Sequence, residues 1–325
     1  MRLAPILDSV LKLNLGHRLR ATQRREILSM SQILSNCNLC RVNDASVVYP
    51  AGIAQRNQIV SCNRCGLMYA SPRAEADNLE IESWEDNPDW DVAKEVPQRV
   101  EKERLQIRDY ADSRALLARL YPQRGKIVEI GSGLGFQLEA FRNEGWDVLG
   151  IDPDRNSCRH ATQKLNIPTI ASTLEAAGLP DASADVVLML HVIEHLPDPL
   201  ATLRQIHRVL KPRGHLVLET PRYDTLMYKV LGRRERSLRC DGHIYFYTTD
   251  SLRRTYEAAK FDLVQLDYVG RSLTFDRLAY NIGVITRGPA IQQWISSMSR
   301  RLGLQKIRFY LNFHDMQRVC LRKNV

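Results

Sequence analysis

The segment from Lys126 to Asp152 constrains the fold of this chain more than any other. It reads KIVEIGSGLGFQLEAFRNEGWDVLGID, so an apolar run, a glycine-rich turn, a helix-like run and a second apolar run follow one another. Glycine tolerates positive φ and lets a ligand approach the backbone at a helix N-terminus. Asp152 ends the second apolar run 21 residues after Gly131, where doubly wound folds place a carboxylate for ribose hydroxyls. The segment predicts a nucleotide-like ligand at the edge of a parallel sheet.

The spacing of the glycines indicates which kind of ligand this is. Glu129 precedes Gly131, Gly133 and Gly135 in an E-x-G-x-G-x-G pattern, which differs from the G-x-G-x-x-G dinucleotide fingerprint. An acid at that point is unfavourable beside a pyrophosphate, but it suits a cationic amino acid moiety. The loop therefore favours a cofactor other than a dinucleotide.

Strand-like and helix-like segments alternate from Lys126 onward, which is typical of βαβ units and a mostly parallel sheet covered on both faces. Strands are expected at 126–130, 147–151, 168–171, 184–190 and 215–220, and closing strands at 261–269 and 317–322. Helices are expected at 98–120, 136–143, 155–165, 199–210 and 249–259. The fold class is therefore α/β, doubly wound and Rossmann-like.

Over about residues 125–270 the chain resembles the class I S-adenosylmethionine-dependent methyltransferases. Beyond the glycine loop, LPDASADVVLMLHVIEHLPDPLATLRQIHRVLKPRGHLVLETP and HIYFYTTDSLRRTYEAAKFDLV are similar to later motifs of the ubiquinone-type and small-molecule O-methyltransferases. Arg213 stands where that subgroup usually has glycine, but Gly214 retains the turn. The resemblance implies a seven-stranded sheet whose last strand is antiparallel, with the cofactor across the carboxyl ends of strands one, two and four.

The resemblance also assigns candidate residues to the cofactor S-adenosyl-L-methionine. Glu129 and Gly131 would flank the methionine part, Gly133 and Gly135 would line the loop, and Asp152 would hold the ribose. The family often has an acidic residue near the adenine amino group, in the segment before Leu179. In this chain the residues at that place are Ser172, Thr173 and Glu175, and of these Thr173 is assigned to the adenine. His191 begins the loop that follows the fourth strand, and is assigned to the cofactor as well.

Histidines near the carboxyl ends of the strands are candidates for a catalytic base. His195 follows the fourth strand and His243 lies in CDGHIYFYT, and an imidazole titrates near neutral pH. The alternative for His195 is a structural role, in which it and Glu194 hold the loop beside the cofactor. The sequence shows no clear Asp/Glu/His set for a catalytic divalent metal, which disfavours a metal-dependent, catechol-type mechanism.

Four cysteines form two close pairs, Cys37 with Cys40 and Cys62 with Cys65, in a C-x₂-C-x₂₁-C-x₂-C pattern. Two such knuckles complete a tetrahedral Cys₄ site, which predicts structural Zn²⁺ rather than disulfides. The alternative is a set of buried free thiols. CGLMYASPR resembles the N-terminal zinc-binding region found before some bacterial small-molecule and sugar methyltransferases, and the module is expected to pack on the substrate side. The remaining cysteines, Cys158, Cys240 and Cys320, are expected to be buried thiols.

The chain is divided by these patterns into four parts. They are a basic amphipathic N-terminal segment (1–36), the Cys₄ zinc-binding module (37–72), an acidic connector and helix (73–121), and the methyltransferase domain (122–325). The N-terminal segment is expected to dock on the protein or a second subunit, or else to contact a membrane surface as a peripheral helix. No apolar stretch is long enough to span a bilayer and no secretory signal is apparent, so the cytoplasm is the expected location.

The predicted function is transfer of a methyl group to a small-molecule acceptor, as O-methylation of a sugar or other biosynthetic intermediate. The net charge of +9, with basic residues concentrated in 1–36, 211–240 and 287–325, leaves open an RNA methyltransferase that grips nucleic acid with the zinc module and basic flanks. A third alternative is a non-catalytic protein that keeps the cofactor fold as a scaffold. The identity of the acceptor is not determined by these patterns.

Overall fold

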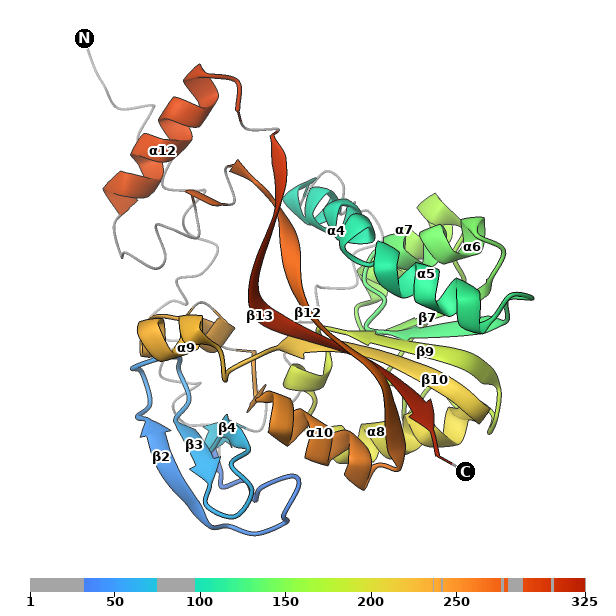
Figure 1. Ribbon diagram of the computed structural model, residues 1–325, viewed down its shortest axis with the longest axis horizontal. Helices are drawn as coiled ribbons and strands as arrows, with labels where there is room; N and C mark the ends of the chain where they lie inside the picture. The colour runs from blue at the N-terminus through green and yellow to red at the C-terminus, as the bar shows by residue number, and fades with distance from the viewer. Residues whose placement is uncertain are drawn as a thin grey trace.

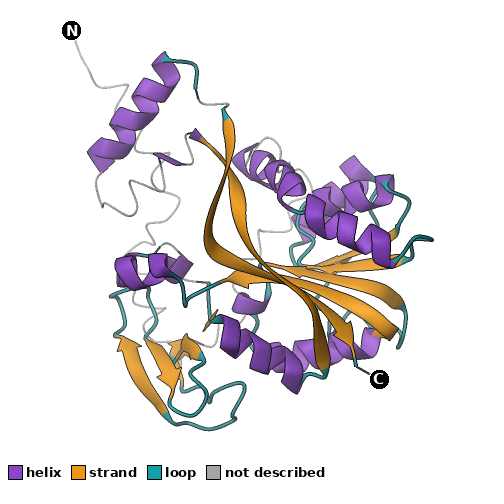
Figure 2. Cartoon of the chain, viewed as in Figure 1, coloured by secondary structure: helices purple, strands orange, loops and turns teal. Residues whose placement is uncertain are grey.

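The structure is a computed structural model that describes residues 32–74, 97–235, 237–240, 242–275, 278–279, 289–304 and 307–324. The helix expected within 1–36 and most of the acidic connector, with Trp84 and Trp90, lie outside these residues. The described part forms a large sheet between two layers of helices, with a smaller sheet beside it (Figures 1 and 2).

The large sheet has seven strands in the order β12-β13-β10-β9-β6-β7-β8. Their bounds are β6 Lys126–Ile130, β7 Asp147–Asp152, β8 Thr169–Ala171, β9 Ala184–Leu190, β10 Leu210–Pro221, β12 Phe261–Thr274 and β13 Arg308–Lys323. β6 to β10 run parallel, and β13 is antiparallel to both of its neighbours, β10 and β12. The mostly parallel α/β sheet predicted from the sequence is confirmed, including the antiparallel last strand.

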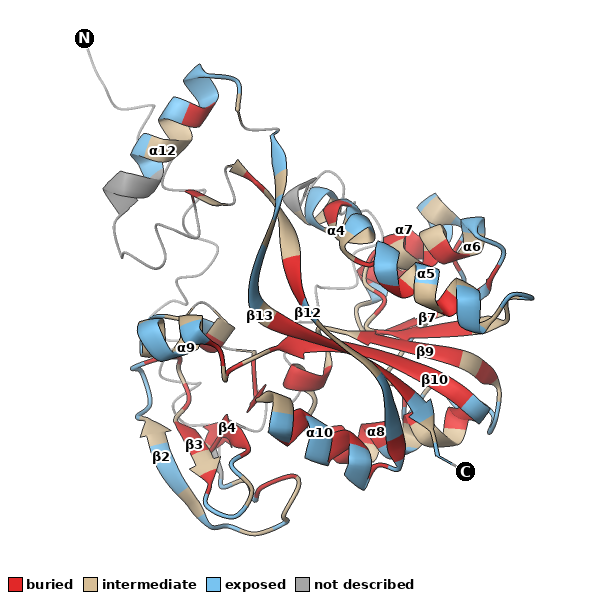
Figure 3. Cartoon of the chain, in the orientation of Figure 1, coloured by how far each residue is buried: buried red, intermediate tan, exposed pale blue. Residues whose placement is uncertain are grey.

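Helices cover both faces of this sheet, so its central strands are buried on both sides. One face carries α5 (Ala111–Leu120), α6 (Phe136–Asn143) and α7 (Arg155–Leu165), and the other carries α8 (Pro199–Val209) and α10 (Thr249–Ala258) (Figures 1 and 3). From Val186 to Met189 every residue of β9 is buried, as expected for a parallel strand between two helical layers. The apolar residues of α8 point the same way because they recur at helical spacing.

The helix expected from Gln98 to Leu120 is two helices, α4 (Pro97–Asp109) and α5, separated at Tyr110. The ring of Tyr110 is buried beneath the guanidinium of Arg318, 4.6 Å from the ring centroid. The carboxylate of Asp109 accepts hydrogen bonds from the backbone N–H and hydroxyl of Ser272, at 2.9 and 2.5 Å. These contacts with distant strands end the first helix, and they position α4 beside the glycine loop.

The closing strands are longer than the sequence predicted. β12 and β13 continue past the sheet as a twisted two-stranded ribbon, and α12 (Pro289–Arg301) lies near its tip (Figure 1). The outer part of β13 alternates exposed and half-buried residues from Arg308 to Asn312, and Arg271 to Leu273 of β12 are half-buried. Such a pattern gives a weaker hydrophobic signal than a strand buried on both faces.

The cysteine module is built on a four-stranded sheet in the order β11-β4-β3-β2. The strands are β2 (Ala45–Tyr49), β3 (Ile59–Cys62), β4 (Met68–Ala70) and β11 (Tyr245–Phe246). Because β11 lies in the chain between β10 and α10, the larger domain contributes one strand to the sheet of the module. A short two-stranded sheet joins β1 (Gln32–Ile33) to β5 (Arg73–Ala74). The module therefore shares structure with the larger domain.

Short helices complete the described residues: η3 (Ile193–His195), α9 (Leu226–Leu231), η4 (Gly232–Arg234) and η5 (Ser237–Arg239). Within the described residues, every helix is too short or too polar to cross a membrane. Cys158 and Cys320 are buried as expected, whereas Cys240 is exposed because it follows η5 at the surface.

Candidate functional site

A cavity of about 560 Å³ opens at the carboxyl ends of β6, β7 and β9. Ile130, Asp152 and Leu190, each at or near the end of its strand, contribute to its wall. Doubly wound sheets bind ligands at this edge, and the volume is within the range of small-molecule sites. The cavity is therefore the candidate binding site.

The structure brings most of the predicted site residues together around this cavity. Gly131, Asp152, Thr173, His191 and His195 all line it, and Ser172 and Glu175 line the same part as Thr173. Glu129, Gly133, Gly135 and His243 are not part of the lining. The roles assigned to these residues remain predictions.

Gly131 cannot be replaced without disturbing the cavity wall. Its φ is +70°, and a Cβ there would lie 2.4 Å from Cγ2 of Val192. Val192 belongs to the loop after β9 and lines the cavity with Gly131. The absence of a side chain allows these two loops to approach each other.

Carboxylates accept hydrogen bonds from two N–H groups of the glycine loop. The N–H of Gly133 donates to Oδ2 of Asp152 at 2.8 Å, and the N–H of Leu134 donates to Oε2 of Glu103 at 3.0 Å. The other oxygen of Asp152 accepts from the N–H of Asp154 at 2.8 Å. These two loop N–H groups are therefore engaged by acids rather than directed at a phosphate, which supports the argument from the glycine spacing.

Three acids, the half-buried Glu103 and the buried Glu129 and Asp152, gather below the loop, and burial raises the pKa of each. Arg99 contacts Glu103 at 3.1 Å, but Oε2 of Glu129 is buried without a hydrogen-bond partner among the described residues. A buried acceptor without a partner calls for an explanation, and a cationic ligand group would supply one. The arrangement fits the ammonium and sulfonium charges of S-adenosylmethionine.

Glu103 and Arg99 were not predicted as site residues. Both lie on α4, whose sequence has a high content of charged residues and no motif. Only the break at Tyr110 brings this helix over the loop. No local pattern in the sequence identifies such a contact.

A buried network connects the loop after β9 to the outer strands. Nε2 of His191 lies 3.1 Å from Oε1 of Glu219, and Nε of Arg318 donates to Oε2 of Glu219 at 2.6 Å. Oε2 of Glu194 accepts a hydrogen bond from the hydroxyl of Thr220 at 3.0 Å. The loop is therefore held through side chains of β10 and β13.

The two candidate bases differ in access. His195 lines the cavity, whereas His243 is buried behind it, with the two ring centroids 4.7 Å apart. Burial lowers the pKa of His243 to about 3. Burial opposes the charged form of His191 also, but hydrogen bonds and charges from Glu194 and Glu219 raise its pKa. Of the two candidates, His195 is the one whose side chain lines the cavity.

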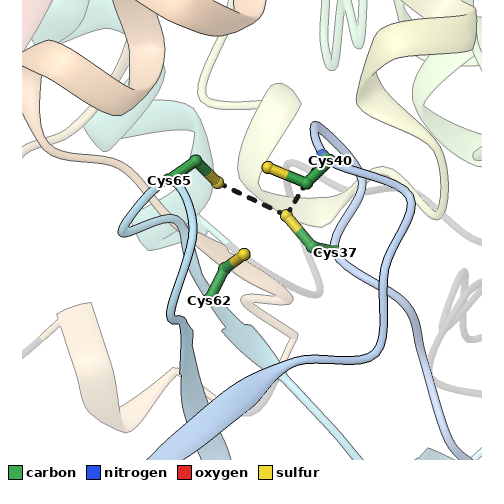
Figure 4. A group of neighbouring side chains, drawn as sticks. All are labelled: Cys37, Cys40, Cys62 and Cys65. Atoms are coloured by element: carbon green, nitrogen blue, oxygen red, sulfur yellow. Dashed lines mark hydrogen bonds between the residues drawn. The ribbon is translucent and has the colours of Figure 1, made fainter.

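The four paired cysteines converge on one point, with all four sulfurs within 4.8 Å of one another (Figure 4). Sγ of Cys37 lies 3.5 Å from Sγ of Cys65, close to the roughly 3.8 Å expected between thiolates around one tetrahedral Zn²⁺. Each knuckle turns through a residue of positive φ, Arg41 at 60° and Gly66 at 73°. The geometry and donor set fit the predicted zinc site.

The first knuckle also supports the cavity wall. The side chain of Asn38 is buried; it donates to Oδ1 of Asp198 at 2.8 Å and accepts from the N–H of Leu200 at 3.1 Å. Arg41 pairs with the same Asp198 carboxylate at 3.1 Å. Asp198 lines the cavity. It also caps the N-terminus of α8, because its carboxylate accepts a hydrogen bond from the N–H of Ala201. The cysteine module therefore contacts the loop that forms one side of the site.

Curated proteins similar to part of this chain include methyltransferases. The chain is 32% identical over 101 residues to ubiquinone biosynthesis O-methyltransferase of Vibrio parahaemolyticus, covering 29% of this chain and 43% of that one. It is 32% identical over 96 residues to a probable S-adenosylmethionine-dependent methyltransferase of Mycobacterium tuberculosis, covering 29% of this chain and 35% of that one. The aligned region is therefore less than half the length of either relative.

A solved structure of an S-adenosylmethionine-dependent methyltransferase from Thermotoga maritima covers 72% of this chain and 99% of its own length, with 18% identity and a TM-score of 0.46. The family model described as a methyltransferase domain matches residues 101–266, which are 166 of the 325 residues. The matched region extends from α4 through the glycine loop and the cavity to β12. Because this is more than half of the chain, the protein belongs to the methyltransferase domain family.

Proposed function

We propose that this protein is an S-adenosylmethionine-dependent methyltransferase that methylates an oxygen of a small-molecule acceptor. The observation that carries the proposal is the cavity at the ends of β6, β7 and β9, with Gly131 and Asp152 in its wall and buried acids below. The names of the similar proteins support the same activity. The family membership supports the cofactor class, and the acceptor class is our inference.

The roles proposed for the residues follow from their positions. Asp152 would bind the ribose, Thr173 would lie near the adenine, and Glu129 would face the amino acid end. The cofactor supplies an activated methyl group, so the protein's task is to align the acceptor with it and to exclude water. His195, in the cavity wall, would accept the proton of the acceptor hydroxyl.

Replacing Asp152 with alanine should weaken binding of S-adenosylmethionine by about 1–3 kcal/mol, roughly 5- to 150-fold, because charged hydrogen bonds are lost. The carboxylate also holds the N–H groups of Gly133 and Asp154, so the loop itself should loosen. Isothermal titration calorimetry measures the affinity. Asp147→Ala, an exposed acid at the start of β7, is the control and should bind normally. Equal affinity of both variants and the native protein would refute the assignment of Asp152.

Zinc at the cysteine cluster would be structural, holding the module and, through Asn38, the cavity wall. Asn38→Ala should lower affinity for S-adenosylmethionine several-fold, since Asp198 and the N–H of Leu200 lose a buried partner. Asn63 is the equivalent residue of the second knuckle, and its contacts to Asp44 and Ser46 stay at the surface of the module. Asn63→Ala should therefore leave the calorimetric affinity unchanged, and the same loss in both variants would argue against this coupling.

The alternative of an RNA substrate lacks a specific supporting contact. The aromatic residues interspersed with the basic stretch 211–240 are Tyr223 and Tyr228, and Tyr223 is fully buried with its ring packed against Tyr228 and Phe246. Tyr223 is therefore not available to stack on bases. A steep salt dependence of RNA binding would nevertheless favour this alternative over a small acceptor.

The alternative of a non-catalytic scaffold makes a different prediction from the two enzymes. Purified protein that shows no calorimetric binding of S-adenosylmethionine would support it. A screen of acceptor pools with methyl-labelled cofactor, including RNA, sugar nucleotides, quinone precursors and lipids, then separates the two enzyme proposals.

A further inference from the structure

Glu194, His195 and His243 converge beside the cavity. Their ligand atoms all lie within 4.8 Å of one another. The residues come from η3 and from the loop before β11, and the N–H of Ile244 joins the two segments by donating to the carbonyl of Glu194 at 2.7 Å. His243 is 48 residues further along the chain than His195, so spacing along the sequence does not reveal the set. The expectation that the chain has no clear Asp/Glu/His set is therefore revised, because these three residues could hold a metal ion.

The second polar atom of each side chain is already engaged. Nδ1 of His195 lies 2.8 Å from the carbonyl of Gly242, and since a carbonyl only accepts, this nitrogen carries the proton. Nδ1 of His243 lies 3.4 Å from the hydroxyl of Tyr223, and Oε2 of Glu194 accepts from Thr220. This leaves Nε2 of His195, Nε2 of His243 and Oε1 of Glu194 as the atoms that could bind a metal ion. Metal-binding histidines are usually held in this way through their other nitrogen.

Oε1 of Glu194 is buried and has no hydrogen-bond partner among the described residues. The nearest charged partner is Nδ1 of His191 at 3.7 Å, which is too long for a hydrogen bond, and the other nitrogen of that ring is closer to Glu219, at 3.1 Å. A carboxylate oxygen inside a protein is costly unless a cation or a hydrogen bond satisfies it. A metal ion between Glu194 and the two imidazoles would satisfy it.

We propose that Glu194, His195 and His243 bind one divalent metal ion, separate from the zinc of the cysteine cluster. Two imidazoles and one carboxylate suit Zn²⁺, Mn²⁺ or Fe²⁺ and leave coordination positions open. Ligand atoms about 2.1 Å from one ion lie about 3.0–3.4 Å from one another when they occupy neighbouring coordination positions. The ligand atoms here lie within 4.8 Å of one another, so binding of the ion would draw the most widely separated of them together. The competing explanation is a protonated His191 that balances Glu194 without any metal.

The role of the ion rests on the proposed function. His195 lines the cavity, so an open position of the ion would face a bound acceptor, whose hydroxyl oxygen becomes a further ligand. Nε2 of His195 would then bind the ion instead of accepting the proton as a base. The ion would lower the pKa of that hydroxyl, and the proton would pass to water. As the oxygen–carbon bond forms, the carbon–sulfur bond of the cofactor breaks and sulfur keeps the electron pair. The substrate class is therefore a hydroxylated acceptor that can coordinate a metal through oxygen.

The test uses the full chain with zinc retained on the cysteines and Mn²⁺ as the probe, because Mn²⁺ prefers nitrogen and oxygen donors to thiolates. Electron paramagnetic resonance counts the bound Mn²⁺. We expect one ion per chain, and an affinity at least about 100-fold lower in Glu194→Gln and in His243→Asn. His207→Asn, a half-buried histidine on α8 bonded to the carbonyl of Asn324, is the matched control and should bind Mn²⁺ normally.

Two outcomes would overturn the proposal: no Mn²⁺ bound at millimolar concentration, or an affinity unchanged in both variants. If the buried variants fail to fold, as judged by near-ultraviolet circular dichroism, His195→Asn at the half-buried cavity wall replaces them with the same expectation. Calorimetry of S-adenosylmethionine on the same samples separates the two proposals. Cofactor binding without Mn²⁺ binding rejects the metal site alone, and Mn²⁺ binding without cofactor binding rejects the proposed function alone.

Discussion

Replacing Arg318 with methionine is expected to lower the free energy of unfolding by about 3–5 kcal/mol. Arg318 on β13 is only 3% exposed, and its guanidinium donates to the Glu219 carboxylate, which is equally buried, at 2.6 Å. It also donates to the carbonyl of Asp109 at 2.8 Å and covers the ring of Tyr110. Methionine fills much of the space but removes the buried guanidinium that balances Glu219, which then keeps only its contact to His191. Urea denaturation monitored by circular dichroism measures the loss.

The same strand offers a control for the Arg318 substitution. Arg322 is half exposed and lies 4.0 Å from Asp262, so Arg322→Met should cost less than about 1 kcal/mol. Adding Glu219→Gln to Arg318→Met should restore part of the stability, because the buried charge that lost its guanidinium partner is then removed. Similar losses in the two single variants would mean that the buried pair is not important for stability. Since Glu219 also contacts His191, the Arg318 variant should bind S-adenosylmethionine more weakly as well.

Replacing Cys62 with serine is expected to release the zinc and unfold the cysteine module. Structural zinc sites contribute on the order of 10 kcal/mol to the folding of small domains, and this module has a core of only modest size. β3 ends at Cys62 and pairs with both β2 and β4, so the whole small sheet should lose order. Elemental analysis measures the zinc, and limited proteolysis followed by mass spectrometry locates cleavage within residues 37–72.

The face of the seven-stranded sheet covered by α5, α6 and α7 should survive this substitution, because its buried cluster contains no residue of the module. The opposite face packs in one cluster with Cys37, Cys62 and Tyr69 of the module, so it should be weakened. Affinity for S-adenosylmethionine should fall but not vanish, through loss of the contact from Asn38 to Asp198. Cys240→Ser, at an exposed cysteine outside the cluster, should change neither zinc content nor stability. Loss of zinc from the Cys62 variant without any loss of stability would contradict a structural role.

Local patterns predicted the central elements of the fold closely. β6, α6, α7 and β9 occupy the residues expected from hydrophobic periodicity, and β7 ends one residue later than expected. These strands lie between two layers of helices, so their sequences are continuous apolar runs that differ clearly from the helices. The cysteine pairs were equally easy to identify from the sequence, because both cysteines of each knuckle lie within four consecutive residues.

Contacts between distant segments were not predictable in this way. The break at Tyr110 depends on Arg318 and Ser272, and the position of Glu103 over the glycine loop follows from that break. β11 lies within the residues of the larger domain in the sequence, but it pairs with β4 of the cysteine module. Each of these depends on which surfaces meet after the chain has folded.

The sequence by itself determined that a glycine loop, a strand-ending Asp152 and two cysteine knuckles are present, because each is encoded within a few neighbouring residues. Only the tertiary structure decided what surrounds them: Glu103 of α4 at the loop, Asn38 against Asp198, and His243 beside Glu194 and His195. These neighbours are far apart in the chain, and burial of side chains between packed elements brings them together. Periodicity and spacing describe what one segment prefers, whereas a site depends on which segments meet.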